Sequence, residues 1–385
     1  FFELGFMKIF QVTTFYHPIT GGVESHVASL AHELKELGHE VTILTSDSSK
    51  VGPRIKVKDG QFEGIFVKRF FTWFSLSQYH RFYPALFFYL LSHDFDIVHV
   101  HGFRKFETYL ALWAAKIKHR KIVLTSHNPF PTTTRSKLSE MFVKIHDATL
   151  GKWFTRSMDK IITILKSENE IFETKFKVPK EKIKTVFNGL NPIFLQDGKA
   201  NEFYSEYGIK REEWDSIVVA GGRMNYAKGF QFLKKAVKSL PNVLFFIAGG
   251  DDGYLSTLKQ IYYDLPNIIF NGKYLPQDKL INIYAGGDIF VLPSIHEATG
   301  GMMLEALSQG CDIIATNQGG TIEYLGKDFG TFIKPDDEDA WLEEIQKRVG
   351  KTKKTKARIQ KAKDFLQNYR WDNLTNKINQ IYKSL

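Results

Sequence analysis

Short apolar runs alternate along the whole chain with longer stretches in which apolar residues recur at helical spacing. The clearest of the longer stretches is 23–37, where Val27, Leu30 and Leu34 share one helical face and Gly38 follows. This alternation is typical of parallel sheets covered by helices, so the pattern predicts an α/β fold. The predicted strands are 8–14, 40–45, 65–70, 96–101, 121–126 and 160–165 in the first half, and 216–220, 243–248, 268–270, 288–292, 312–315 and 331–333 in the second.

The length of the chain and one structure-breaking segment predict two domains. With 385 residues, the chain exceeds what one ordinary hydrophobic core holds. The segment Asn188-Gly189-Leu190-Asn191-Pro192 interrupts the pattern, and we place the join directly after it. The predicted domains are therefore 1–192 and 193–368, and an amphipathic helix follows in 369–385.

The composition is typical of a globular protein from a reducing compartment. Hydrophobic residues make up 43% of the chain and charged residues 24%, as in ordinary soluble globular proteins. Cys311 is the single cysteine, so no disulfide can form within the chain, which fits a reducing compartment. No apolar run is long enough to span a bilayer, and the first residues lack the pattern of a signal peptide. We therefore expect a cytoplasmic protein, and we leave residues 1–6, which precede Met7, out of the fold argument.

The net charge of +10 is unevenly spread. Residues 1–192 contain 27 Lys and Arg against 18 Asp and Glu, whereas residues 193–385 contain 25 against 24; the first half also holds 22 of the 33 Phe. A basic, aromatic-rich half predicts an anionic partner, such as a nucleic acid, a lipid headgroup or a charged small molecule. Cations and aromatics are densest in 66–91 and 135–156, which suits a membrane interface. The alternative is that a helix over 82–91 buries its aromatics in the core.

Two carboxylates bracket a predicted strand-to-helix junction in the second half. Glu297 lies in the loop after strand 288–292, and Glu305 lies in a helix that should begin near Gly301. Free backbone N–H groups at such a junction form an anion site. Each carboxylate can also accept hydrogen bonds from the vicinal hydroxyls of a ribose or a hexose. The pair predicts a nucleotide or sugar site; the alternative is two ordinary solvated charges.

A glycine-rich turn, 221–229, follows strand 216–220 and precedes a helix predicted over 230–240. Arg223 can contact two phosphate oxygens at once, and Lys228 adds a compact point charge. The turn lacks the Gly-Lys-Ser/Thr ending of a Walker loop and the glycine spacing of the dinucleotide fingerprint. It indicates phosphate binding; the alternative is a surface loop with two unremarkable cations.

A second glycine turn, 20–26, follows the first predicted strand, and ligands of open parallel sheets bind where such turns gather. His17 and His26 flank this turn, either as acceptor-side residues or as ordinary surface or capping histidines. His127 ends strand 121–126, so its imidazole should point into the same crevice. His99 and His101 share one face of a strand, but no third ligand has suitable spacing, so we expect no metal site.

In their order and spacing, these motifs resemble those of the family 4 glycosyltransferases, which have the two-domain GT-B fold. The resemblance covers nearly the whole chain and implies two doubly wound Rossmann-like domains facing across a cleft, with the last helix crossing back onto the first domain. It rests on the turn Gly21-Gly22-Val23-Glu24-Ser25-His26, on 38–45, 96–101, Thr125-Ser126-His127 and 188–191, on Gly222-Arg223 with Lys228-Gly229, on Glu297 with Glu305, and on Gly319-Gly320 with Glu323.

The resemblance also implies roles for these residues. Arg223 and Lys228 would hold the diphosphate of a nucleotide-sugar donor, Glu305 would bind the ribose, and Glu297 would hold the donor sugar. His127 would contact that sugar. The implied catalytic residues are Arg223, Lys228, Glu297 and His127, and the implied donor-binding residues are Gly21, Gly22, Gly222, Gly300, Gly301, Met302 and Glu305. Thr299 departs from the aromatic or small apolar residue of many relatives, which leaves the sugar contact there open.

The family implies transfer of a hexose from a UDP- or GDP-sugar with retention of anomeric configuration. Two cations in place of a metal suggest a reaction without metal or other cofactor. The first half offers no well-placed carboxylate nucleophile, which favours front-face displacement over a covalent intermediate.

The acceptor is expected on the basic first half as an anionic lipid or lipid-linked glycan, which would make the protein peripheral on the inner face of the membrane. The alternatives are a nucleotide-sugar epimerase on the same fold, an oxidoreductase, which the missing dinucleotide fingerprint argues against, and a nucleic-acid-binding protein, which no motif supports. We therefore expect no nucleic-acid partner.

Overall fold

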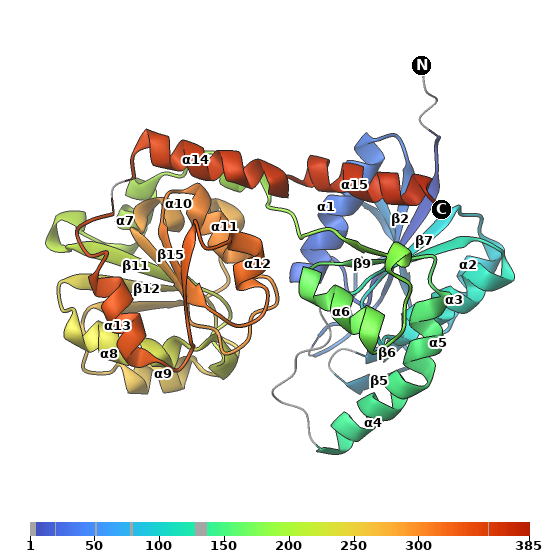
Figure 1. Cartoon of the computed structure of the whole chain (residues 1–385), viewed down its shortest axis with the longest axis horizontal. Helices are drawn as coiled ribbons and strands as arrows, with labels where there is room; N and C mark the ends of the chain where they lie inside the picture. The colour runs from blue at the N-terminus through green and yellow to red at the C-terminus, as the bar shows by residue number, and fades with distance from the viewer. Residues whose placement is uncertain (1–4, 20, 51, 78–79, 128–136, 353) are drawn as a thin grey trace. The chain divides into compact units, whose positions relative to one another are not determined.

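The computed structural model describes residues 5–385 apart from 20, 51, 78–79, 128–136 and 353. The chain divides into two compact units, shown in Figure 1. Unit 1 comprises Phe1–Gly189 together with Trp371–Leu385, and unit 2 comprises Leu190–Arg370. The boundary after Gly189 lies three residues before the predicted join after residue 192, and the final helix belongs to unit 1.

Unit 1 contains an eight-stranded sheet in the order β10-β9-β8-β7-β1-β2-β4-β3. All neighbouring strands run parallel except β3 and β4, which are antiparallel. The strands are β1 (Lys8–Val12), β2 (Glu40–Ser46), β3 (Gly60–Phe62), β4 (Ile65–Phe70), β7 (Ile97–His101), β8 (Lys121–Thr125), β9 (Lys160–Thr163) and β10 (Ile183–Thr185), with a separate antiparallel pair of β5 (Phe74–Ser77) and β6 (His80–Phe82). The helices are α1 (Gly22–Glu36), α2 (Ala85–Ser92), α3 (Phe106–Ile117), α4 (Lys137–Ala148), α5 (Leu150–Ser157), α6 (Lys166–Thr174) and α15 (Trp371–Lys383), with a 3₁₀ turn at Lys180–Lys182.

Alternate residues of the strands in unit 1 enter two different cores. Ile9, Ile97 and Val123 pack with α1 and α15, whereas their neighbours Phe10, Val98 and Ile122 pack with α2 and α3. Both faces of the sheet are therefore covered, as a buried parallel sheet requires. This explains why the strands read as continuous apolar runs rather than as alternating patterns.

Unit 2 contains a six-stranded, wholly parallel sheet in the order β13-β12-β11-β14-β15-β16. Its strands are β11 (Ser216–Gly221), β12 (Val243–Gly250), β13 (Ile268–Gly272), β14 (Ile289–Leu292), β15 (Asp312–Thr316) and β16 (Gly330–Ile333). Its helices are α7 (Ala200–Tyr207), α8 (Lys234–Ser239), α9 (Leu255–Ile261), α10 (Gln277–Gly286), α11 (Gly301–Ser308), α12 (Thr321–Leu325), α13 (Glu338–Gln346) and α14 (Lys356–Leu366), with 3₁₀ turns at Pro192–Leu195, Arg211–Glu213, Tyr226–Lys228, Phe230–Leu233 and Gln367–Tyr369.

Every predicted strand is present in the structure, most with ends that differ by one or two residues. The helix predicted over 230–240 is instead a 3₁₀ turn followed by the short helix α8. The sequence pattern did not reveal β3, β5, β6 and β10, because each has only three or four residues and pairs at a sheet edge or in the separate hairpin.

Helix α15 completes the core of unit 1 although it follows unit 2 in the sequence. Its residues Leu374, Ile378 and Ile381 are buried with Leu30 and Leu34 of α1. The helix also makes polar contacts: Tyr382 Oη lies 2.6 Å from His99 Nδ1, and Asn379 Oδ1 lies 3.1 Å from His39 Nε2. Unit 1 therefore cannot complete its core from the first 189 residues alone.

Replacing Ile378 by alanine should destabilise unit 1, because its fully buried side chain packs between α15 and α1. The loss of transfer energy and the residual cavity together cost about 2–5 kcal/mol for such a change. Urea denaturation followed by circular dichroism measures the difference. The exposed neighbour Lys377→Ala is the control, and equal stability of the two variants would show that α15 contributes little to the core.

Candidate functional site

Three neighbouring strands of unit 2 bring their following loops together at one edge of the sheet. The loops are 222–229 after β11, 293–300 after β14 and 317–320 after β15. Hydrogen bonds join them: Ile295 N–H donates to Ala227 O over 2.9 Å, and Gly320 N–H donates to Glu297 O over 3.2 Å. Carboxyl ends of parallel strands meet at one edge, so segments some 90 residues apart in sequence form one surface.

Lys228 and Glu297 form an ion pair at the centre of this surface. Lys228 Nζ lies 2.7 Å from Glu297 Oε2, and the Ser294 hydroxyl donates to the same oxygen over 3.1 Å. Both charged side chains are largely covered, with 21% and 14% of their surface exposed. Burial acts to raise the pKa of Glu297, but Lys228, the Ser294 hydroxyl and the Gly300 N–H outweigh it and the pKa is lowered. Glu297 is therefore a fixed carboxylate with a cation beside it.

Glycines allow the Glu297 loop to pack closely on its neighbours. Gly300 caps the start of α11 with a φ of 65°, in the left-handed region. Gly319 has a φ of +70°, and a Cβ on it would lie 1.6 Å from Glu297 O, so any other residue would displace that loop. Gly301 opens α11 and is exposed, so its end of the helix faces solvent.

Glu305 lies in α11, in an environment different from that of Glu297. The Tyr284 hydroxyl donates to Glu305 Oε2 over 3.2 Å. Burial raises the pKa of Glu305 to about 7, since the single hydrogen bond from Tyr284 offsets little of the desolvation. Met302, one turn earlier, packs against the end of β11: a Cβ on Gly221 would lie 1.9 Å from Met302 Cε.

Arg223 is not part of the Lys228–Glu297 pair. Arg223 Nη1 donates to Asp252 Oδ2 over 2.9 Å, and 64% of its side chain is exposed. The cause is the path of the turn: Gly222 has a φ of +136°, and Met224 N–H donates to Gly250 O over 2.8 Å, which leads the chain along the end of β12. Arg223 therefore contacts Asp252, whereas Lys228 contacts Glu297. That both cations hold one diphosphate stays a prediction.

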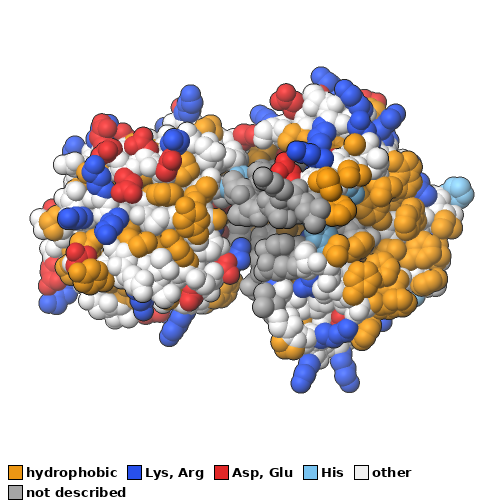
Figure 2. All heavy atoms as spheres, turned by 90° about the horizontal axis from the view of Figure 1, so that it is seen from below, with side chains coloured by type: hydrophobic (Ala, Val, Ile, Leu, Met, Phe, Trp, Pro, Cys, Tyr) orange, Lys and Arg blue, Asp and Glu red, His pale blue; other side chains and the backbone are white. Residues whose placement is uncertain are grey.

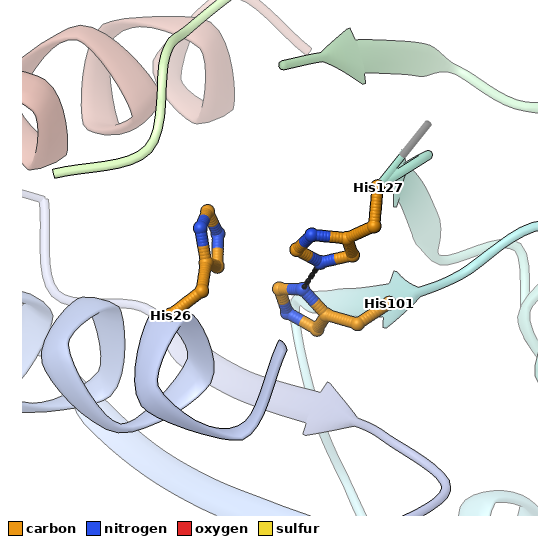
Figure 3. Close-up of side chains that lie close together, drawn as sticks. All are labelled: His26, His101 and His127. Carbon is orange, nitrogen blue, oxygen red and sulfur yellow. Dashed lines mark hydrogen bonds between the residues drawn. The ribbon is translucent and has the colours of Figure 1, made fainter. Parts of the chain in front are cut away.

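The predicted site residues of unit 1 do not all lie together. Figure 3 shows the side chains of His26, from α1, and His127, directly after β8, near each other. Their ring centroids lie 4.8 Å apart. His17 instead stacks on Phe62, with ring centroids 3.6 Å apart. Gly21 lies beside an ion pair: a Cβ on it would be 2.7 Å from Lys50 Nζ, and Lys50 Nζ is 3.0 Å from Glu24 Oε1. Gly22 is exposed at the start of α1.

His101 has neighbours in the fold that sequence spacing did not indicate. His101 was paired with His99 along one strand, and no third ligand had suitable sequence spacing. The structure places one nitrogen of each of His26, His101 and His127 within 4.8 Å of the others. Burial lowers the pKa of all three histidines, to about 4 for His26, and neighbouring histidines lower those of His101 and His127 further. The three imidazoles are therefore neutral near pH 7.

Sequence reasoning missed several charged residues at the same end of unit 1. Glu107 is fully buried and accepts a hydrogen bond from the Thr14 hydroxyl. Burial lowers the pKa of Lys105. Arg81, which the sequence placed among the cations of 66–91, is only 5% exposed. The one signal in the sequence was the turn Gly102-Phe103-Arg104-Lys105 after strand 96–101. In unit 2 the missed partners are Tyr284 and Ser294, whose hydroxyls carry no motif.

Two family models match the chain in succession. The one described as Glycosyltransferase Family 4 matches residues 20–193, and the one described as Glycosyl transferases group 1 matches residues 206–365. Together they span both units, and the chain belongs to the glycosyltransferases of the family 4 type. The resemblance stated from the motifs is thus confirmed.

Relatives and solved structures agree with this assignment. An uncharacterized glycosyltransferase of Methanocaldococcus jannaschii is 26% identical, over 98% of each chain. The phosphatidylinositol N-acetylglucosaminyltransferase gpi3 subunit of Schizosaccharomyces pombe is 24% identical, over 86% of this chain and 70% of the relative. Anabaena HepE in complex with UDP and glucose has a TM-score of 0.77 at 18% identity, over 98% of this chain and 100% of that chain. Sucrose-phosphate synthase of Thermosynechococcus elongatus has a TM-score of 0.74 at 16% identity, over 98% of each. The fold is GT-B, as predicted.

Within the described residues, none of the helices has the length and apolar character needed to cross a bilayer.

Glu305→Gln should change how stability depends on pH. The folded pKa of about 7 lies above the ordinary value of 4.5. The stability contributed by the protonated form is therefore fully present below about pH 4.5 and is lost as pH rises through about 7. Gln stays neutral and can still accept a hydrogen bond from Tyr284. The stability of the variant relative to the wild type should therefore increase progressively from pH 5 to pH 8.

Thermal unfolding scans across this range measure the difference. The exposed Glu343→Gln is the control for removing a carboxylate from a helix. A constant gap between Glu305→Gln and wild type at every pH would contradict the raised pKa.

Proposed function

We propose that the protein transfers a hexosyl group, with retention of configuration, from a nucleoside-diphosphate sugar to an acceptor at a membrane surface. The observation that carries the donor part is the covered Lys228–Glu297 pair beside the start of α11. A covered cation next to exposed helix-start amides suits a diphosphate, and a fixed carboxylate beside them suits sugar hydroxyls.

In this proposal, the residues of unit 2 stabilise the departing nucleotide. The bond between the anomeric carbon and the phosphate oxygen breaks, and the charge that grows on the diphosphate is neutralised by Lys228. Arg223 is the second cation, because its exposed guanidinium can exchange Asp252 for a more highly charged ligand. These cations supply the positive charge at the donor, so we propose that donor binding requires no metal.

We assign Glu297, with the amides of Gly300 and Gly301, to the donor sugar, and Glu305 to the ribose of a UDP- or GDP-sugar. The raised pKa of Glu305 also lets it donate a hydrogen bond while it is protonated. Among solved structures of the same fold, that of HepE was obtained with UDP and glucose, which supports this ligand class. His127 of unit 1 is assigned to the sugar, and Gly21 and Gly22 to the phosphates.

Retention is proposed through front-face displacement. The acceptor oxygen forms its bond to the anomeric carbon on the side from which the phosphate leaves, and the hydroxyl proton passes to the departing phosphate oxygen. Both transfers balance without a protein nucleophile.

The proposed acceptor side is the exposed apolar surface of unit 1. Helices α4 and α5 present a face that no described element covers, and Figure 2 shows hydrophobic side chains gathered on this unit. We call this the α4–α5 face; its apolar residues are 47–61% exposed and are Met141, Phe142, Ile145, Leu150 and Trp153. Patches of exposed large apolar side chains mark interaction sites.

Cations accompany the apolar side chains. Lys144 lies within the α4–α5 face with 73% of its side chain exposed, and Arg156 lies one turn after Trp153 and is exposed. Apolar groups at the lipid boundary with basic groups at headgroup level are typical of interfacial helices on anionic membranes. Relatives named as subunits of phosphatidylinositol N-acetylglucosaminyltransferase, from Schizosaccharomyces pombe and Homo sapiens, support a lipid acceptor.

The second basic, aromatic segment, 66–91, is mixed in character. The alternative, that a helix over 82–91 buries its aromatics, holds for Tyr83, which is buried in the core with Leu86 and Leu90, but not for Phe88. Trp73, Leu76 and Phe88 are 65–70% exposed. Residues 78–79 of this segment and 135–136 of the other lie outside the described residues. The α4–α5 face therefore carries the membrane proposal.

Lys228→Ala should lower turnover by about 100- to 1000-fold, since loss of one group that stabilises developing negative charge costs this much in other enzymes. The assay is donor hydrolysis and transfer, with the donor chosen by thermal shift from UDP-, GDP- and ADP-sugars. Lys238→Ala, an exposed lysine of the helix that follows the loop, is the control.

Equal activity of the two lysine variants would remove Lys228 from the mechanism. NMR of the first product anomer in the same assay tests retention, and an inverted product or a trapped glycosyl-enzyme would overturn the front-face path.

Ile145→Glu should abolish binding to vesicles of phosphatidylcholine with phosphatidylserine, because it places a charge within the α4–α5 face. Co-sedimentation at low salt measures binding, and added salt should weaken that of the wild type. Tyr263→Glu, at an 84% exposed aromatic of unit 2, is the control. Wild-type protein that stays in the supernatant at low salt, or Ile145→Glu that sediments like the control, would count against this surface.

A further inference from the structure

A network of buried polar side chains lies at the carboxyl edge of the sheet in unit 1. His26 and His101 are each 2% exposed, and His127 is partly exposed at the rim. The three rings come from α1, β7 and the end of β8, and Figure 3 shows them converging. His101 Nδ1 lies 3.1 Å from His127 Nε2.

In His26 and His101, the nitrogen that contacts a side chain outside the three rings is called here the outer nitrogen, and the other is called the inner nitrogen. The hydrogen bond of the outer nitrogen determines whether the inner nitrogen carries a proton or a lone pair. His26 Nδ1 lies 2.9 Å from Asn188 Oδ1, an acceptor, so Nδ1 carries the proton and Nε2 carries the lone pair. His101 Nε2 lies 2.6 Å from Gln11 Oε1, so its Nδ1 carries the lone pair. The Gln11 amide is itself oriented, because its Nε2 donates to Tyr382 Oη over 3.4 Å.

One of these nitrogens lacks a hydrogen-bond partner among the described residues. His26 Nε2 is buried and has no hydrogen-bond partner within the described part of the chain. Leaving a buried polar atom unsatisfied is costly, and such an atom calls for an explanation such as an ion or a water. The ring of His26 lies 4.8 Å from that of His127 and 5.5 Å from that of His101, between centroids, and such a group of imidazoles favours an ion that accepts lone pairs.

We propose that His26, His101 and His127 form a binding site for a divalent transition-metal ion of the zinc type. Three neutral imidazoles with an open fourth position are a known zinc ligand set. The outer contacts of His26 and His101 are those expected of metal ligands, which donate their second N–H to a carbonyl or carboxylate oxygen.

The spacing of the nitrogens suits this ion after a small adjustment. Nitrogens at about 2.0–2.1 Å from a tetrahedral zinc lie about 3.3 Å apart. His101 Nδ1 and His127 Nε2, 3.1 Å apart, already come close to this spacing, and one nitrogen of each of the three rings lies within 4.8 Å of the others. A rotation of His26 about its side-chain bonds would therefore close the set. Binding moves the proton of His127 Nε2 to its Nδ1 and breaks the hydrogen bond between the two rings.

An ion here would occupy the Nε2 of the residue assigned to the donor sugar. Bound metal and donor would then compete, and zinc would inhibit transfer. This consequence rests on the proposed function, whereas binding of the ion does not.

The test is isothermal titration of the full, chelator-treated chain with Zn²⁺ alone. We expect one ion per chain. His26→Asn keeps a donor for Asn188 but deletes Nε2, and His101→Gln keeps a donor for Gln11 but deletes Nδ1. Loss of a residue that hydrogen-bonds a metal ligand weakens metal binding by about 10- to 100-fold. Each of these two variants loses a ligand itself, so it should weaken Zn²⁺ binding by more than this. His32→Ala, an exposed histidine of the same helix, should bind as wild type.

A second measurement does not depend on the variants folding. Co²⁺ added to wild-type protein should give the intense visible absorption of a four- or five-coordinate site, and X-ray absorption should count three imidazole nitrogens around bound Zn²⁺. Folded wild-type protein that binds no Zn²⁺, or an ion whose ligands are not imidazoles, would overturn the site. If wild-type protein binds Zn²⁺ at this site but transfers sugar at the same rate with and without the ion, the role of His127 in transfer would be wrong, whereas the metal site would stand.

Discussion

The parallel direction of the strands is the constraint on which both candidate sites depend. Where parallel strands are joined through helices, the strand-to-helix turns open at the same edge of the sheet. In unit 2 this places the Lys228 turn beside the Glu297 loop, and in unit 1 it places the end of β8 beside the end of β7 and the start of α1. The polar residues that meet there are separated in sequence by helices whose own residues serve mainly to cover the sheet.

Glu297 and Glu305 show how environment separates two identical side chains. Glu297 has a cation, a hydroxyl and an amide at hand, and they outweigh its burial and lower its pKa. Glu305 has one tyrosine hydroxyl, and burial raises its pKa. Groups whose environments push their pKa values apart commonly take different roles in one site. A permanent carboxylate suits recognition of hydroxyls beside a cation, and a carboxyl that titrates near neutrality can both accept and donate.

The polar interior of unit 1 depends on the return of the chain. Tyr382 of α15 contacts both His99 and Gln11, and the Trp371 ring lies 5.0 Å from that of His26. Gly189 has no room for a side chain, because a Cβ would lie 2.5 Å from the Trp371 ring. The last helix therefore orients Gln11, which in turn sets the tautomer of His101, and it packs against the ring of His26. Folding of the apolar core and ordering of the polar network are coupled through one helix.

The sequence by itself determined the α/β class, the twelve predicted strands and the family, because apolar periodicity and glycine turns are local properties. It also singled out Lys228 and Glu297 from their places in loops that follow strands, and Glu305 from its place in the helix after one of these loops. Only the tertiary structure decided which partners they have. It separated Arg223 from the pair, because the backbone of the turn follows the end of β12. It also brought His101 next to His26 and His127. These three residues come from different elements, and their distance in space cannot be read from their separation along the sequence.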